Sequence, residues 1–343
     1  MSTFIIAEAG VNHNGDPALA RRLVEVAAAS GADAVKFQSF SADKLSVRGA
    51  EKAEYQKRGT ADGDQYDMLK ALELSEELHR SLVGRCRELG IEFMSTAFDE
   101  DSLNLLVDLG IRRIKVPSGE LTNHPFLRFM TRKDLPLIVS TGMASLAEVE
   151  DAIRVIAEER TIRGFEGTME EMVTILHCTS NYPAAVADVN LNAMLTMGRT
   201  TGLPVGYSDH TLGTTISVSA VAMGARVIEK HFTLDKTMPG PDHSASLEPE
   251  ELAALVKGIR DVEAAFGDGV KMPSASELPV RALVRRSVTV ARTVPAGAQL
   301  GPDDITLMRP GTGIAPGDFE AVIGRRAIRD LNAGQTLVWA DLE

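Results

Sequence analysis

Eight short apolar runs, separated by longer segments that alternate with them along the chain, restrict most strongly how this sequence can fold. Each run has the length and character of a buried strand. The runs fall at residues 4–9, 34–38, 92–97, 114–117, 136–140, 174–178, 203–207 and 226–231. Several of the intervening segments carry apolar residues at helical spacing, namely 17–30, 76–89, 146–158 and 249–266.

Strict alternation of strand and helix implies parallel strands joined by right-handed crossovers. Eight such units, completed by residue 266, predict a (β/α)₈ TIM barrel over residues 1–266. An open, doubly wound sheet is the alternative. It ranks second because no G-x-G-x-x-G motif opens the first helix.

The composition changes after residue 266. Residues 267–282 are rich in glycine, proline and serine, which is typical of a linker. Residues 283–343 contain short β-like runs at 287–291, 327–329 and 336–339, broken by turn sequences. This pattern predicts a small, turn-rich second domain.

The connection between the second and third runs, residues 39–75, is much longer than an ordinary loop and is polar around residues 58–64. We interpret it as an excursion that contributes to an active site. A disordered insertion is the alternative.

Charge and cysteine content exclude several classes of protein. The net charge of −12 argues against nucleic acid or an anionic membrane as the main partner. No apolar run approaches the ~18 residues that cross a bilayer, and the N-terminal residues lack the pattern of a secretory signal. The chain has two cysteines, Cys86 and Cys178, which favours a reducing cytoplasm.

Histidines end the seventh and eighth units, at His210 and His231. Because neighbouring parallel strands end at the same rim, the two imidazoles can converge on one divalent metal ion. With only two protein ligands, positions remain open for substrate or water, as in a catalytic site. The alternative is that both histidines cap strand ends through hydrogen bonds.

Polar residues also follow the other strands, at the rim where TIM barrels carry their chemistry. Lys36 and Lys115 lie at or near strand ends, where they can bind phosphate or carboxylate. Two alternatives are a Schiff-base lysine and a buried salt bridge with Glu8 or Glu120. Asp242, in a loop rich in proline and glycine, can bind a sugar hydroxyl or transfer a proton.

The order of these motifs resembles the sialic acid synthases, also called nonulosonate synthases. The resemblance rests on IIAEAGVNHNG at 5–15, VKFQ at 35–38, KVPSGE at 115–120, STGM at 140–143, HCTSNYP at 177–183, GYSDHTL at 206–212, EKHFT at 229–233 and GPD at 240–242. It spans nearly the whole chain, since the C-terminal segment resembles the antifreeze-like (SAF) module.

The resemblance implies an enzyme that condenses phosphoenolpyruvate with the open-chain form of an N-acetylated amino sugar. The products would be a nine-carbon 2-keto acid and phosphate. The motifs at 177–183 and 230–249 are closer to the N,N′-diacetyllegionaminate synthases. The acceptor is therefore expected to be 2,4-diacetamido-2,4,6-trideoxymannose, with N-acetylmannosamine as the other candidate.

The resemblance also implies roles for individual residues. His210 and His231 would bind Mn²⁺ or Mg²⁺, and Glu8, Glu120 and Asp242 would be catalytic. The residues expected to bind the two substrates are Lys36, Gln38, Thr96, Lys115, Ser118, Ser140, Ser180, Tyr182, Ser208 and Arg309. Arg309 would reach the active site of a partner subunit, which implies a domain-swapped homodimer.

Other functions remain open at this point. Another phosphoenolpyruvate aldol synthase would take a phosphorylated sugar and would need a second basic cluster. A pseudaminate synthase or a metal-dependent hydrolase is also possible. A glycan-binding protein with a degenerate barrel is disfavoured because the rim keeps His210, His231, Lys36, Lys115 and Glu120.

Overall fold

The computed structural model, which describes residues 2–60 and 63–343, contains a closed barrel of eight parallel strands. β1 pairs with both β2 and β8, which closes the barrel and excludes the open sheet. The predicted TIM barrel is therefore confirmed. The strands are β1 (Phe4–Gly10), β2 (Ala34–Ser39), β3 (Glu92–Ala97), β4 (Ile114–Val116), β5 (Leu137–Ser140), β6 (Val173–Cys178), β7 (Val205–Asp209) and β8 (Val227–His231).

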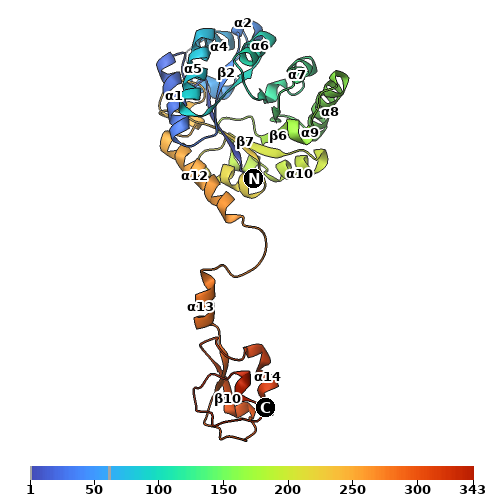
Figure 1. Ribbon diagram of the computed structural model, residues 1–343. Coiled ribbons are helices and arrows are strands. Elements are labelled where there is room, and N and C mark those ends of the chain that lie inside the picture. The colour runs from blue at the N-terminus through green and yellow to red at the C-terminus, as the bar shows by residue number, and fades with distance from the viewer. Residues whose placement is uncertain (1, 61–62) are drawn as a thin grey trace. The chain divides into compact units, whose positions relative to one another are not determined.

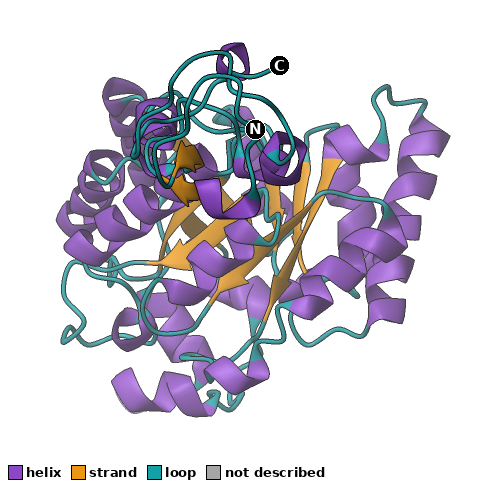
Figure 2. Ribbon diagram, turned by 90° about the horizontal axis from the view of Figure 1, so that it is seen from below, coloured by secondary structure: helices purple, strands orange, loops and turns teal. Residues whose placement is uncertain are grey.

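Helices surround the strands of the barrel (Figures 1 and 2). The longer ones are α1 (Pro17–Ala29), α5 (Glu76–Leu89), α6 (Glu100–Asp108), α7 (His124–Thr131), α8 (Leu146–Arg163), α10 (Asn192–Thr201), α11 (Thr215–Ala222) and α12 (Pro249–Ala265). Shorter turns of helix in the connections are α9 (Met169–Met172), η1 (Ser118–Glu120), η2 (Val186–Asp188) and η3 (His243–Ala245).

Strand alternation separates two environments. On β1, Ile5 and Ala7 face outward into the large core between strands and helices, whereas Ile6 belongs to a separate apolar cluster inside the barrel. That inner layer consists of Ile6, Ala34, Met94, Ile138, Leu176 and Val227.

A polar layer lies above the apolar one. Because side chains on a strand alternate with a period of two, the interior residue next toward the carboxyl end lies two positions further along each strand. Those positions are Glu8, Lys36, Thr96, Ser140, Cys178 and Glu229. The carboxyl end of the barrel interior is thus polar, whereas the layer below it is sealed by aliphatic side chains.

The long connection between β2 and β3 is folded. It contains α2 (Ala42–Leu45), α3 (Glu54–Gly59) and α4 (Gln65–Ala71), and Met68 and Leu72 of this region join Val11 and Phe40 in a small apolar cluster. The alternative of a disordered insertion is wrong for the part that the structure describes. Residues 61 and 62 of the excursion lie outside it.

Residues Gly267–Glu343 form a second compact unit. The segment expected to be a linker includes the start of α13 (Glu277–Val284). The other elements of this unit are β9 (Ser287–Val290), η4 (Pro302–Asp304), β10 (Ile305–Met308), η5 (Pro316–Asp318), α14 (Phe319–Val322) and η6 (Trp339–Asp341).

The unit has its own apolar core, which includes Val288, Leu300 and Leu331. β9 pairs antiparallel with β10, a strand that the sequence analysis missed. Conversely, the runs at 327–329 and 336–339 make single bridges rather than strands, because turns interrupt the pairing on either side of them.

Among the described residues, every helix is either too short or too polar to cross a bilayer.

Candidate active site

A cavity of about 490 Å³ opens at the carboxyl ends of the barrel strands. It brings together twelve of the residues predicted for the site. They are Glu8, Lys36, Gln38, Thr96, Lys115, Ser118, Ser140, Ser180, Tyr182, Ser208, His210 and His231. They come from all eight strands or from the loops that directly follow them, so closure of the barrel alone is sufficient to collect them.

Two lysines and two glutamates alternate in the polar layer of the barrel. Nζ of Lys36 lies 2.7 Å from Oε2 of Glu8 and 3.7 Å from Oε2 of Glu229. Nζ of Lys115 lies 3.2 Å from Oε1 of Glu229. All four side chains are at most 6 % exposed. The predicted salt-bridge alternative is therefore correct for Lys36 and Glu8, while Lys115 uses Glu229 and not Glu120.

Burial and neighbouring charges set the ionisation of this group. Burial raises the pKa of Glu8 to about 7, against the opposing effect of Lys36. Burial would also raise the pKa of Glu229, but the charges of Lys115 and Lys36 outweigh it and bring that pKa to about 2. Glu229 is thus the fixed anion of the cluster, whereas Glu8 can change its protonation near neutral pH.

Hydroxyl and backbone groups complete a cradle beside the lysines. Ser118 Oγ accepts a hydrogen bond of 2.9 Å from the backbone N–H of Gly142. A Cβ at Gly142 would lie 2.2 Å from Ser180 Oγ and 2.8 Å from Cys178 Sγ, so only glycine fits there. Ser140 Oγ is buried and has no hydrogen-bond partner among the described residues. Such a buried hydroxyl is available to an anion bound next to the lysines.

The two histidines lie close to each other, with ring centroids 5.6 Å apart. The centroid of the Tyr182 ring lies 4.1 Å from the centroid of the His210 ring and 5.6 Å from that of the His231 ring. Nδ1 of His210 is 2.7 Å from the carbonyl oxygen of Thr179. Because a carbonyl only accepts, Nδ1 donates this bond, and Nε2 of the neutral ring keeps its lone pair. Nδ1 of His231 is buried, 3.7 Å from Oδ2 of Asp242.

These histidines fit a divalent cation. Burial lowers the pKa of His210 to about 4. Burial, together with the nearby His210 and Lys36, which disfavour a second positive charge, holds the pKa of His231 well below its usual range. Both rings are therefore neutral, which is the form that binds metals. In the described part of the chain no three His, Cys, Asp or Glu side chains form a metal cage. A cation held here would complete its coordination with substrate or water.

Three predicted residues lie outside the lining of the cavity. Asp242 is buried behind His231, and burial raises its pKa to about 6. Glu120 is partly exposed in η1, where its carboxylate accepts a hydrogen bond from Asn123. Arg309 is an exposed residue of the second unit.

The cavity also contains residues that the sequence analysis did not assign. Glu229 lies opposite Ser208 in the register of β7 and β8 and accepts a hydrogen bond of 3.2 Å from its hydroxyl. The sequence could have indicated this position, because Glu229 lies two residues before His231 and so on the same face of the strand. Cys178 lies in the same polar layer. From the excursion after β2, the lining residues are Leu45, Ala53, Gln56, Gln65 and Leu69.

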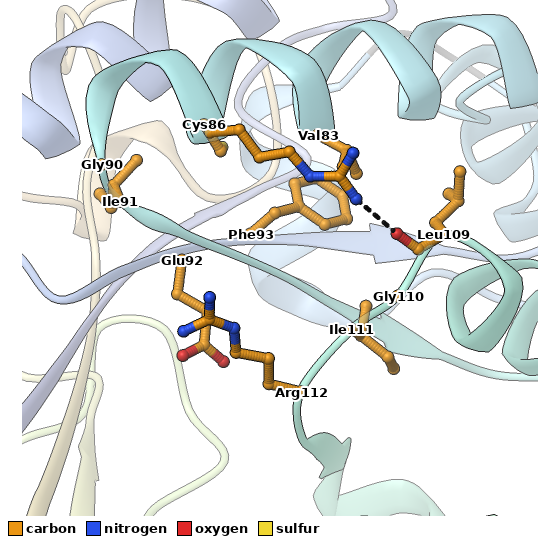
Figure 3. Close-up of a pocket in the computed structure, with 11 residues that line it drawn as sticks. Val83, Cys86, Gly90, Ile91, Glu92, Phe93, Leu109, Gly110, Ile111 and Arg112 are labelled. Atoms are coloured by element: carbon orange, nitrogen blue, oxygen red, sulfur yellow. Dashed lines mark hydrogen bonds between the residues drawn. The ribbon is translucent and has the colours of Figure 1, made fainter.

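A separate groove of about 340 Å³ lies at the opposite, amino-terminal ends of β3 and β4 (Figure 3). Its lining includes Phe93, Leu109 and Ile111, and Arg87 donates a hydrogen bond of 3.3 Å to the carbonyl of Leu109. None of the predicted site residues lines this groove within the part of the chain that the structure describes.

Two sequence models match the two units of the chain. The NeuB family model matches residues 23–271, and the SAF domain model matches residues 285–343. The chain belongs to the NeuB family. The resemblance to the sialic acid synthases and the SAF assignment of the C-terminal segment are thereby confirmed.

Relatives of this NeuB-family chain align along most or all of its length. It is 55 % identical to the N,N′-diacetyllegionaminic acid synthase of Legionella pneumophila over 345 aligned positions, which cover 100 % of this chain and 95 % of the relative. It is 46 % identical to the enzyme of the same name from Campylobacter jejuni, with 96 % of each chain covered. Among solved structures, a sialic acid synthetase from Leptospira borgpetersenii in complex with citrate is 34 % identical, with a TM-score of 0.69 over 82 % of this chain and 90 % of that one.

Proposed function

We propose that this protein condenses phosphoenolpyruvate with 2,4-diacetamido-2,4,6-trideoxymannose to give N,N′-diacetyllegionaminate and phosphate. One structural observation carries the proposal. A single cavity combines a cradle for an anion, made by Lys36, Lys115 and the unpartnered Ser140, with two neutral histidines. The names of the relatives from Legionella and Campylobacter support the choice of acceptor.

The lysines and serines would hold the donor substrate. Phosphoenolpyruvate carries a phosphate and a carboxylate, and both lysines reach the cavity from the interior of the barrel. Lys36 also donates a hydrogen bond of 2.9 Å to Thr96 Oγ1, which fixes its position. Charge-assisted hydrogen bonds of this kind are strong in a buried site.

The reaction proceeds in three steps. Carbon 3 of phosphoenolpyruvate attacks the aldehyde carbon, a carbon–carbon bond forms, and the aldehyde oxygen becomes a hydroxyl by taking up one proton. Water adds to carbon 2 of the resulting cation and releases one proton. The tetrahedral intermediate then loses phosphate by cleavage of the bond between carbon 2 and the bridging oxygen. The hydroxyl on carbon 2 gives up its proton, which the departing phosphate takes up, and the ketone is left. Glu8 lines the cavity and has a pKa of about 7, so it is suited to carry the protons of the first two steps. Asp242, with a pKa of about 6, lies behind His231 and would act on the substrate only through that residue.

We further propose that His210 and His231 hold Mn²⁺ or Mg²⁺. A divalent cation bound there supplies Lewis acidity for the aldehyde oxygen. Tyr182, which lies against both rings, shields that side of the site and restricts the rotation of the imidazoles.

The wall formed by the excursion supports an acceptor without phosphate. Leu45 and Leu69 of the excursion, together with Phe98 after β3, offer apolar surface, which suits acetamido methyl groups and a deoxygenated sixth carbon. Among the described lining residues, the only lysines or arginines are Lys36 and Lys115, and both already have carboxylate partners. A second phosphate group would find no cation there.

We also propose a homodimer in which Arg309 of one subunit completes the active site of the other. Arg309 is exposed on a compact unit of its own. A guanidinium can donate to the acetamido carbonyl of the acceptor.

An acceptor panel tests the proposed function. Purified protein is incubated with phosphoenolpyruvate, Mn²⁺ and, in turn, 2,4-diacetamido-2,4,6-trideoxymannose, N-acetylmannosamine and N-acetylmannosamine 6-phosphate. The expected result is phosphate release and a nine-carbon product by mass spectrometry, greatest with the first sugar and lost on chelation. Release of phosphate without any acceptor would contradict the proposal, as would preference for the phosphorylated sugar.

A further inference from the structure

A buried ion pair joins β7 and β8 directly behind the two histidines. Asp209 and Lys230 lie opposite each other in the register of the two strands, and each immediately precedes one of the histidines. Nζ of Lys230 is 3.0 Å from Oδ2 of Asp209, and both side chains are 0 % exposed. Such a pair is costly to bury, so a protein that keeps one must hold it with further hydrogen bonds.

The pair lies on the outer face of the barrel. Ser208 and Glu229, one position earlier on each strand, line the cavity inside it. Because successive side chains of a strand point to opposite faces, Asp209 and Lys230 face the helical layer. There Ser217 of α11 donates a hydrogen bond of 2.6 Å to Oδ2 of Asp209.

The same two side chains hold the loop that follows His210. Oδ1 of Asp209 accepts hydrogen bonds of 2.8 Å from both the backbone N–H and the hydroxyl of Thr211. Nζ of Lys230 donates to the carbonyl of Thr211. The residues on either side of His210 are thus tied to the residue that precedes His231.

We infer that the Lys230–Asp209 ion pair positions the two histidines relative to each other, so that His210 and His231 can bind one cation together. This inference rests on the proposed metal site. Lys230 and Asp209 are positioning residues, because they do not line the cavity and act through their neighbours. Residues that orient metal ligands in this way change metal affinity about 10- to 100-fold when they are replaced.

A merely structural ion pair would behave differently. Its loss would lower thermal stability without a selective effect on metal binding. Arg160 offers a matched control, because its side chain is 7 % exposed and its Nη1 lies 2.9 Å from Oδ1 of Asp134, in a part of the chain that contributes nothing to the cavity.

The test compares Lys230→Met with Arg160→Met in the full-length protein. Mn²⁺ and phosphoenolpyruvate binding are each measured by isothermal titration calorimetry, and folding is checked by circular dichroism. We expect Lys230→Met to weaken Mn²⁺ binding about 10- to 100-fold and to weaken phosphoenolpyruvate binding much less. Arg160→Met should leave Mn²⁺ affinity unchanged.

Ser217→Ala covers the case in which Lys230→Met does not fold. It removes a single donor to Asp209, and we expect a smaller loss of Mn²⁺ affinity in the same direction. Unchanged Mn²⁺ affinity in the folded Lys230→Met protein, or in Ser217→Ala if only that variant folds, would overturn the inference. Wild-type protein that binds no Mn²⁺ would overturn it as well. Failure of the proposed reaction would instead appear as absent product with Mn²⁺ binding intact, so the two failures are distinguishable.

Discussion

Glu229 lies between the two lysines that we propose as ligands of the donor substrate. Its carboxylate is 3.2 Å from Lys115 Nζ and 3.7 Å from Lys36 Nζ, and its pKa of about 2 keeps it charged. Burial lowers the pKa of Lys115, and the charge of Glu229 offsets this only in part. For Lys36, burial is outweighed by the charges of Glu229 and Glu8, which raise its pKa. Both lysines are held in place by carboxylates before any substrate arrives. A phosphate or carboxylate that enters the cavity shares these lysines with Glu229. Because Glu229 already holds the lysine side chains in place, binding of the anion requires little further loss of their conformational entropy.

Replacement of Lys115 by methionine tests this role. Because the lysine contacts the donor and not the acceptor in our account, Lys115→Met should raise the KM for phosphoenolpyruvate at least about tenfold, as expected for loss of one charge-assisted contact, and change the KM for the sugar little. Lys236→Met, which removes a half-exposed partner of Glu251 outside the cavity, is the control. Steady-state kinetics with each substrate varied in turn provide the measurement.

Borohydride distinguishes this role from Schiff-base chemistry. We expect no covalent adduct at Lys36 or Lys115 when the enzyme is treated with borohydride during turnover. An adduct at either lysine in the mass spectrum would refute electrostatic binding.

At the scale of elements, strand periodicity made much of the site predictable. The apolar runs and the polar residues at their carboxyl ends indicated that Lys36, Lys115, His210 and His231 meet, and all four line one cavity. Thr96 and Ser208, which also line it, were expected from the resemblance to the sialic acid synthases. Glu229 was missed although its spacing from His231 places both side chains on the same face of β8. Its ion pairs with Lys36 and Lys115 join β8 to β2 and β4, and such contacts across the barrel cannot be seen in one strand.

The excursion between β2 and β3 was predictable only as a whole. Its length and polarity indicated a role at the site, but Gln56, Gln65 and Leu69 reach the cavity through tertiary packing of α3 and α4. For Glu120 the sequence predicted a place in the site that the structure does not give it. The residue lies near a strand end, but it is part of η1, where its side chain bonds Asn123 and does not line the cavity. Local patterns cannot fix the direction of such loop side chains.

The apolar wall of the excursion yields a prediction about the acceptor. Leu69→Ser removes apolar contact that we assign to the sugar, worth about 1–2 kcal/mol, or about tenfold in affinity. The KM for the acceptor should rise accordingly while the KM for phosphoenolpyruvate stays near its wild-type value. Val47→Ser, at a position 77 % exposed in the same excursion, is the matched control. A selective change in the KM for phosphoenolpyruvate would contradict this assignment of the wall.

His13, in the loop after β1, leads to a prediction about how the free energy of unfolding depends on pH. His13 is 0 % exposed, and burial lowers its pKa to about 4 from 6.5. Between those two pH values the unfolded chain binds more protons than the folded one, so the free energy of unfolding must fall as pH falls. The contribution of His13 lost by pH 5 is about 2 kcal/mol.

Thermal unfolding of wild type and His13→Asn between pH 7.5 and 5 checks this. Asparagine keeps an acceptor for the Gly15 N–H, which donates to Nδ1 of His13 over 3.0 Å. We expect the melting temperature of the variant to fall less steeply with acid. Parallel curves for the two proteins would show that His13 does not titrate as described.

At the scale of the whole molecule, the barrel and the SAF domain are separate compact units with separate cores. The barrel supplies every residue that lines the cavity in the described part of the chain. The proposed role of Arg309 in the cavity of a partner subunit must therefore be tested on an assembly of two chains.

Mixing two inactive variants tests the shared site. Arg309→Ala and His231→Ala are combined under conditions that allow subunits to exchange, and product formation is followed. If Arg309 acts in the partner's site, a mixed dimer has one site with both residues intact, and activity returns to as much as about a quarter of wild type for random exchange in a C₂ dimer. If each subunit uses its own Arg309, one site of the mixed dimer lacks only Arg309 and the other lacks only His231. No activity would then be recovered.

The most direct test of the central claim follows the bridging oxygen of phosphoenolpyruvate. The donor is labelled with ¹⁸O between carbon 2 and phosphorus and incubated with the wild-type protein, Mn²⁺ and 2,4-diacetamido-2,4,6-trideoxymannose. Our account predicts that the label leaves in phosphate, with one molecule of unlabelled nine-carbon keto acid formed for each phosphate released. Label retained in the keto acid, or labelled phosphate without a nine-carbon product, would contradict it.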